Sequence, residues 1–169
     1  MSNAAFFYGT LISPDVQCRV LCGSSNKTPA SILKLSSLRM RPAILKGHKR
    51  YALKDRPYPG IVATGNDQDS VRGIVCEGLS PADVKRLDLY EGDEYKRDQV
   101  QVVPIDDKDD GSVSCQAYIW IEGNDQLENY DWDEDHFLKV KAASWLADDE
   151  EFSEVDKLDI PQQQQQQQT

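Results

Sequence analysis

The amino-acid sequence predicts an α+β domain in which a small, curved or closed, largely antiparallel sheet carries helices at its edges. Three observations support this fold class: short strand-like runs are numerous, segments with helical starts and stops are few, and few spacings suit parallel crossovers. At 169 residues, the chain has the usual length of one domain. We place this domain at residues 1–150 and interpret residues 151–169, which are acidic and end in a glutamine run, as a disordered tail.

The strand-like runs are bounded by glycine, proline and acidic residues, which are typical of turns. We expect strands at Ala5–Tyr8, Pro42–Leu45, His48–Lys54, Ile61–Thr64, Val71–Leu79, Tyr95–Val103 and Val113–Ile121. The second and third of these runs are interpreted as a hairpin that turns at Gly47. Ser31–Leu38 fits either a strand or a helix.

Helix starts are marked by capping residues. Ser13 precedes a proline and an aspartate, which predicts a helix over Pro14–Cys22 that ends at a glycine. Ser80–Asp83 combines a capping serine, a proline at the first helical position and an acid at the third, and it predicts the best-defined helix of the chain. The acidic Asp131–Glu134 stretch predicts the start of another helix.

The charge of the chain excludes some classes of partner. The net charge is −10 and the pI is about 4.6, so nucleic acid and anionic membranes are not expected to bind. No apolar run approaches membrane-spanning length, and no charged-then-apolar leader opens the chain. We therefore expect a soluble, cytoplasmic protein.

The cysteine pattern gives no sign of a metal site or a disulfide framework. The chain has four cysteines without a CxxC pair, and it has only two histidines to serve as imidazole ligands. We expect buried free thiols at Cys18, Cys22, Cys76 and Cys115. No metal and no other cofactor are expected.

The stretch Phe6–Leu11 combines an aromatic, strand-like run with a turn at Gly9, and a helix start follows at Ser13. This compression of strand, turn and helix start directs free backbone N–H groups toward one point, where an anion can bind. The alternative interpretation is an ordinary strand-to-helix connection.

Glu91 continues an apolar helical stripe, because it follows Leu87 by four residues and Val84 by seven. Burial and the negative end of the helix dipole would both raise its pKa toward the range of a general base. The alternative is a frayed helix end with Glu91 in solvent, since most carboxylates are exposed. Asp88 and Glu94 are nearby acids, and Glu94 is the second candidate for the base.

A set of short motifs in this order resembles the AIG2-like branch of the gamma-glutamylcyclotransferase family, from about Phe6 to Trp145. The motifs are Tyr8-Gly9-Thr10-Leu11, Arg41-Pro42-Ala43, Tyr58-Pro59-Gly60-Ile61, Arg72-Gly73, Leu87-Asp88-Leu89-Tyr90-Glu91-Gly92 with Tyr95 and Arg97, Ala117-Tyr118, and Trp132-Asp133. The resemblance implies a small mixed barrel with helices packed on it.

The resemblance also implies an enzyme of the acyl-transfer or lyase type that acts on a small γ-glutamyl compound. The α-amine of such a compound attacks its own γ-carbonyl and releases 5-oxoproline and an amine. The turn formed by Tyr8, Gly9, Thr10 and Leu11 would bind the glutamyl moiety, and Glu91 would be the general base. Tyr118 is a candidate hydrogen-bond donor in the pocket, with a role as a buried core tyrosine as the alternative.

Two other functions remain open at this stage. One is a non-catalytic AIG2-like binding protein that keeps the barrel and the pocket. The other is a related acyl-transfer or cyclisation enzyme of specialised metabolism that uses the same base. The chain departs from the simplest members of the family in its 23–38 segment and in its acidic, glutamine-rich end, so the substrate stays open as well.

Overall fold

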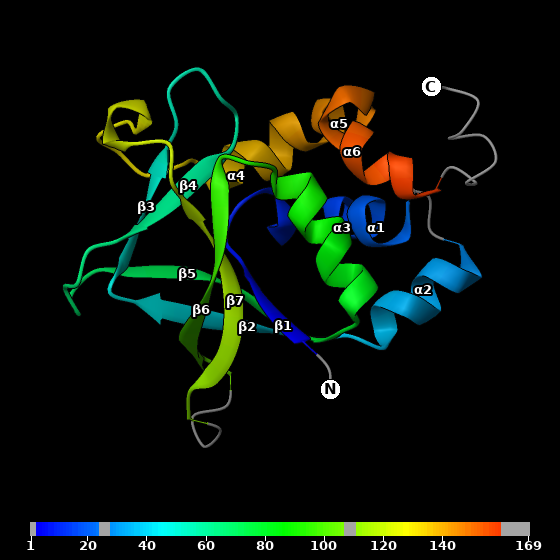
Figure 1. Ribbon diagram of the computed structural model, residues 1–169, viewed down its shortest axis with the longest axis horizontal. Helices are drawn as coiled ribbons and strands as arrows, with labels where there is room; N and C mark the ends of the chain where they lie inside the picture. Colours follow the sequence, from blue (N-terminus) through cyan, green and yellow to red (C-terminus); the bar gives the residue numbers. More distant parts are fainter. Residues whose placement is uncertain (1–2, 24–27, 107–110, 160–169) are drawn as a thin grey trace.

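The computed structural model describes residues 3–23, 28–106 and 111–159. Five strands close into a barrel in the order β1 (Asn3–Phe7), β5 (Ser70–Leu79), β2 (Arg39–Lys46), β6 (Tyr95–Pro104) and β7 (Val113–Trp120) (Figure 1). β1 pairs with β7 in parallel, and the other four neighbouring pairs are antiparallel. The predicted α+β fold, with a mixed, largely antiparallel barrel, is therefore confirmed.

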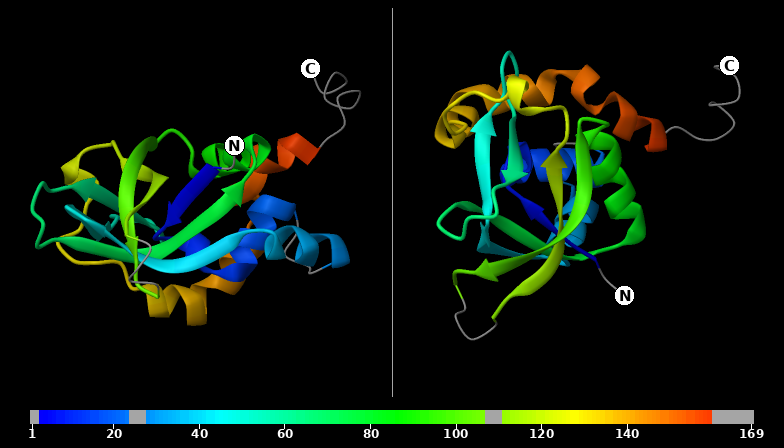
Figure 2. Two further views of the ribbon diagram at one scale, coloured as in Figure 1. Left: turned by 90° about the horizontal axis from the view of Figure 1, so that it is seen from below. Right: turned by 60° about the vertical axis from the view of Figure 1, so that its left-hand side comes forward.

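The helices gather beside the barrel. The structure has helices α1 (Pro14–Cys22), α2 (Pro29–Ser36), α3 (Pro81–Glu91), α4 (Glu134–His136), α5 (Ala142–Ala147) and α6 (Ser153–Asp156), with a π-helical turn at Phe137–Lys141 and 3-10 turns at Thr10–Ile12, Asn124–Gln126, Asp149–Phe152 and Lys157–Asp159. α1 contacts α3 and α5, and α6 contacts α3, so the C-terminal helices lie on the same side of the barrel as α1 and α3 (Figure 2). Within the described ranges, no helix is both long enough and apolar enough to span a membrane.

The helix starts predicted from capping residues are confirmed. The side chain of Ser13 accepts a hydrogen bond from the Val16 backbone N–H, and the Ser80 and Asp83 side chains form a reciprocal capping box at the start of α3. Thr28 and Ser31 form another capping box, which makes the ambiguous Ser31–Leu38 segment helical at its beginning. These caps satisfy backbone donors that no carbonyl within the helix can reach.

The expected hairpin between the second and third predicted strands is wrong. β3 (His48–Ala52) pairs with β4 (Pro59–Ala63) in a separate two-stranded sheet and not with β2. Both edges of β2 are already occupied, by β5 on one side and β6 on the other. Gly47, with a φ of 74°, therefore turns the chain out of the barrel and does not form a hairpin within it.

The alternation of side chains along β1 divides the core into two parts. Phe6 and Tyr8 pack with residues contributed by the other strands, whereas Ala5 and Phe7 pack with the residues that join the helices to the barrel. Gly73 of β5 allows this close packing, because an added Cβ would lie 2.3 Å from the Phe7 carbonyl oxygen. The end of β1 thus lies between the two halves of the core.

The expectation of a tail from residue 151 needs correction. The helical turns continue as far as Asp159, and the side chains of Phe152 and Val155 are fully buried. The Arg19 guanidinium makes two hydrogen bonds to the Asp156 carboxylate, at 2.6 and 2.8 Å. The expected domain boundary at residue 150 therefore falls inside a packed segment, whereas the glutamine run lies outside the described residues.

We predict that Phe152→Ala lowers the free energy of unfolding by about 3–5 kcal/mol, because truncation leaves a cavity in the core. Leu158→Ala is the control, since this residue of the same segment is 38% exposed and its truncation should change the stability by less than about 1 kcal/mol. Urea denaturation followed by circular dichroism measures both. If the two variants were equally stable, residues 151–159 would not be packed against the core and the original expectation of a tail would hold.

Candidate active site

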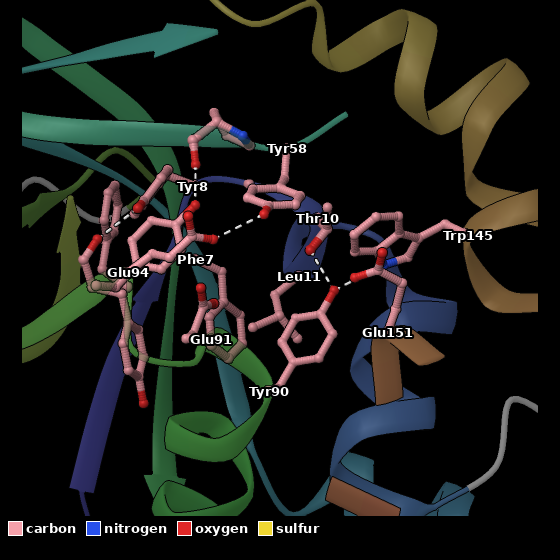
Figure 3. Close-up of a pocket in the computed structure, with 15 residues that line it drawn as sticks. Phe7, Tyr8, Thr10, Leu11, Tyr58, Tyr90, Glu91, Glu94, Trp145 and Glu151 are labelled. Atoms are coloured by element: carbon pink, nitrogen blue, oxygen red, sulfur yellow. Dashed lines mark hydrogen bonds between the residues drawn. The ribbon is translucent and has the colours of Figure 1, made fainter. Parts of the chain in front are cut away.

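A cavity of about 200 Å³ lies where the end of β1, α3 and the C-terminal helices meet (Figure 3). Its walls include every site residue predicted from the sequence, which are Tyr8, Gly9, Thr10, Leu11, Glu91 and Tyr118, together with the second candidate Glu94. The remaining wall consists of Phe6, Phe7, Tyr58, Pro59, Tyr90, Tyr95, Trp145 and Glu151. Residues far apart in the chain are therefore gathered around one space.

The turn after Tyr8 leaves backbone donors free. It is closed by hydrogen bonds from the Ile12 N–H to the Gly9 carbonyl at 3.0 Å and from the Ser13 N–H to the Thr10 carbonyl at 3.1 Å. In the part of the chain that the structure describes, the N–H groups of Gly9, Thr10 and Leu11 have no acceptor. All three residues line the cavity, so the turn offers donors to a ligand.

Tyr8 fixes the start of this turn. Its hydroxyl donates a 2.5 Å hydrogen bond to the Tyr118 carbonyl, and its own carbonyl accepts a 2.6 Å hydrogen bond from Arg50 Nη1. Arg50 also forms ion pairs with Asp131 at 2.8 Å and with Glu134 at 3.3 Å. Burial raises the pKa of Tyr8 well above its usual value, so its hydroxyl stays protonated and keeps its role as a donor.

Glu91 is the last residue of α3, and its carboxylate points into the cavity (Figure 3). Among the described residues, this carboxylate has no hydrogen-bond or ion-pair partner. Burial first, and the negative charge of Asp88 second, raise the pKa of Glu91 to about 8. Near neutral pH the group therefore exchanges a proton readily, which suits a general base.

Glu94 is engaged in structural contacts, in contrast to Glu91. One oxygen accepts a 3.0 Å hydrogen bond from the Tyr58 hydroxyl, and the other lies 2.6 Å from Arg56 Nη2. α3 ends at Gly92, whose φ of 80° turns the chain before Glu94 is reached. Glu94 therefore ties the segment around Tyr58 to the rim of the cavity.

Tyr118 lines the cavity, but its hydroxyl has another partner. It donates a 2.8 Å hydrogen bond to the Asp88 carboxylate, which also pairs with Arg97 Nη1 at 2.9 Å. The geometry links Tyr118 to Asp88, whose negative charge adds to the effect of burial in raising the pKa of Glu91.

One wall of the cavity was missed by the sequence-based predictions. The Tyr90 hydroxyl forms a 2.7 Å hydrogen bond with Thr10 Oγ1 and accepts a 2.8 Å hydrogen bond from Trp145 Nε1. Tyr58 and Trp145 meet edge to face, with their ring centroids 5.8 Å apart. The position of Tyr90 on the apolar stripe of α3 could have predicted that it lines the cavity. Trp145 and Glu151 could not have been predicted in this way, because only tertiary packing brings them to the cavity.

The described residues contain no group of three or more histidine, cysteine or acidic side chains arranged to hold a metal ion. Cys18, Cys76 and Cys115 are buried and Cys22 is partly buried, and none of the four forms a disulfide within the described ranges. The cavity thus brings together the buried Glu91 carboxyl and the backbone N–H groups of the turn.

The sequence has relatives among known proteins. Residues 5–134 match the family described as "Gamma-glutamyl cyclotransferase, AIG2-like". The chain is 31% identical over 145 residues to Protein AIG2 C of Arabidopsis thaliana, and the match covers 86% of this chain and 78% of that protein.

Two solved structures share the fold. The solution structure of an Arabidopsis thaliana protein has a TM-score of 0.61 and 29% sequence identity, and the match covers 93% of this chain and 85% of the other. The crystal structure of a yeast gamma-glutamyl cyclotransferase specific to glutathione has a TM-score of 0.54 and 11% identity, with 92% and 96% of the two chains covered, so that likeness concerns the fold alone. The extent of the family match and the identity to Protein AIG2 C show that the chain belongs to the AIG2-like gamma-glutamyl cyclotransferase family.

Proposed function

We propose that the protein is a gamma-glutamyl cyclotransferase. The α-amine of a γ-glutamyl compound attacks the γ-carbonyl carbon, a new C–N bond closes the ring of 5-oxoproline, and the original amide C–N bond breaks to release an amine. The observation that carries this proposal is the Glu91 carboxylate, which faces the cavity without a partner among the described residues. The family membership of the chain supports it.

The turn is assigned the role of binding the substrate carboxylate. Three N–H groups, at Gly9, Thr10 and Leu11, have no acceptor in the described part of the chain and line the same cavity as Glu91. A carboxylate bound there would be held while the glutamyl chain folds back on itself, which brings the α-amine to the γ-carbonyl. Such orientation replaces a difficult encounter with a favourable intramolecular one.

Glu91 is assigned the proton transfers. The α-amine arrives as an ammonium ion, which cannot attack until it loses a proton. An α-amino group at a peptide N-terminus has a pKa of about 8, and the carboxylate beside the α-amine of a γ-glutamyl compound raises it somewhat above this value, so it lies near or above the value of about 8 for Glu91. A proton can therefore pass to Glu91 and later to the leaving amine without a large energetic penalty in either direction.

A non-catalytic binding protein explains this cavity less well. The burial of a carboxylate without a partner destabilises the fold, and a binding site for an ammonium group alone would favour an ordinary, low pKa. A related cyclisation of another metabolite uses the same base, and it would be revealed by products other than 5-oxoproline.

We predict that Glu91→Gln keeps the fold and the binding of a γ-glutamyl compound but lowers the turnover number by two to four orders of magnitude, about the usual contribution of a general base. Release of 5-oxoproline measures turnover, and calorimetry with a non-cleaved analogue measures binding. Glu94→Gln is the matched control and should lower turnover less than tenfold, because Glu94 is engaged with Tyr58 and Arg56. The roles of the two glutamates would be exchanged if only Glu94→Gln were inactive.

We predict that kcat/KM rises tenfold per pH unit below a midpoint near 8 and levels off above it, since Glu91 must be deprotonated to act as the base. The substrate amine titrates in the same range. Asp88→Asn distinguishes the two groups, because the loss of a neighbouring negative charge should lower the pKa of Glu91 alone and move the midpoint to lower pH. A midpoint near 4.5 in the wild type would exclude Glu91 as a base with a raised pKa.

We predict that L-glutamate shifts the backbone amide signals of Gly9, Thr10 and Leu11 in nuclear magnetic resonance spectra, with smaller shifts for α2, none of whose residues lines the cavity. Gly9→Ala should weaken the binding, because its Cβ would lie 3.1 Å from the Pro59 ring and would displace the turn. Shifts confined to other parts of the barrel would place the ligand carboxylate elsewhere.

A further inference from the structure

The wall of the cavity is rich in carboxyl groups. Three glutamates line it, at positions 91, 94 and 151, and its lining includes no lysine, arginine or histidine. Arg56 compensates Glu94, and Glu91 is the proposed base. The Glu151 carboxylate has no hydrogen-bond or ion-pair partner among the residues that the structure describes. The charges that act on its carboxyl group, those of Asp148 and Glu150, are also negative.

Glu151 lies at the other side of the cavity from Glu91. Figure 3 shows Glu91 and Glu94 on one side, Trp145 and Glu151 on the other, and Thr10, Leu11 and Tyr90 between them. The Trp145 ring lies at the Glu151 side and meets the ring of Tyr58, whose hydroxyl reaches across to Glu94; the two ring centroids are 5.8 Å apart. Aromatic rings beside an uncompensated carboxylate form an environment that favours a cation.

The position of Glu151 is set by the packed C-terminal segment. The adjacent Phe152 is fully buried and stacks on Tyr90, with 5.5 Å between the ring centroids. The Arg19 guanidinium lies 4.4 Å from the Phe152 ring centroid and pairs with Asp156. This segment follows residues 5–134, over which the chain matches the family. The wall that carries Glu151 is therefore supplied by a part of the chain beyond the stretch that matches the family description.

We propose that Glu151 is a specificity-determining residue that binds a positively charged group on the amine portion of the substrate, so that the preferred substrates are γ-glutamyl derivatives of diamines. The proposal rests on the proposed function. The turn and Glu91 occupy the glutamyl end of the substrate, which leaves the Glu151 side for the amine portion. The second ammonium group takes no part in the reaction: the α-amine forms the new bond, and the proton that it loses passes through Glu91 to the nitrogen that leaves.

The same charge disfavours γ-glutamyl peptides. The amine portion of such a peptide ends in a carboxylate, which Glu151 would repel inside a partly desolvated cavity. A neutral alkylamine would gain contact with Tyr58 and Trp145 but no attraction to the carboxylate. The expected order of substrates is therefore cationic, neutral and anionic.

Three γ-glutamyl amides of matched length test this order: those of diaminobutane, pentylamine and aminopentanoate. For the wild type, kcat/KM should be about tenfold higher for the diaminobutane amide than for the pentylamine amide. A factor of about ten corresponds to the free energy of one charge-assisted hydrogen bond in a partly exposed site. Glu151→Gln should abolish this preference, and Glu151→Lys should favour the aminopentanoate amide. Glu154→Gln, which removes the same charge from an exposed residue paired with Lys157, should keep the wild-type order.

Calorimetric binding of the three amides to Glu91→Gln, or to the wild type if it turns none of them over, separates this proposal from the proposed function. Preferential binding of the diaminobutane amide that depends on Glu151 would uphold the proposal even if no amide were cleaved, and only the cyclotransferase activity would then be refuted. Equal binding of the three amides, a preference that survives Glu151→Gln, or no binding at all would overturn it.

Discussion

The geometry of the cavity depends on the hydrogen bond from Arg50 to the Tyr8 carbonyl, which holds the chain at the point where it leaves the barrel. Tyr8 directs its side chain into the barrel and donates to the Tyr118 carbonyl, so the residue is fixed from both ends. Arg50 comes from β3, outside the barrel, and is itself held by Asp131. Contacts from β3, from β7 and from the segment around Asp131 thus set the direction of the turn. If the turn rotated, its N–H groups that have no acceptor among the described residues would no longer face the cavity.

The second constraint is electrostatic, because the fold holds the Glu91 carboxyl in a place that disfavours its charge. Its native pKa of about 8 exceeds the ordinary value of 4.5. The unfolded chain therefore releases this proton at lower pH than the native protein does, and the contribution of the protonated group to stability is lost as the pH rises from about 4.5 to about 8. Asp88, held by Tyr118 and Arg97, adds to this effect. Above pH 4.5 the buried carboxyl group thus makes the fold less stable, and in return its pKa lies in the physiological pH range, where it can accept a proton.

The sequence was sufficient wherever the structural cause is local. Helix caps depend on residues within one helical turn, as at Ser13, at Ser80 and at the end of α3. The sequence could therefore predict α1 and α3, and it could predict that Glu91 lies on the apolar stripe of α3. The strand that pairs with β3 could not be predicted, because the pairing depends on which edges of β2 the other barrel strands already occupy. The packed segment after residue 150 was hidden by its acidic composition, although Phe152 and Val155 have the spacing of one helical face.

The two sides of the cavity are held by different means. Around the turn and Glu91, the backbone is fixed by the barrel and by α3, whose positions depend on continuous strand pairing and a capped helix. On the side of Glu151, the wall consists of short helical turns that are held by a few contacts, chiefly the stacking of Phe152 on Tyr90. Yet Tyr90 is adjacent to Glu91 and bonds both Thr10 and Trp145, so the two sides meet at one hydroxyl group. A change in the C-terminal segment can therefore alter which amine portion fits while the barrel keeps the proposed base and the turn in place.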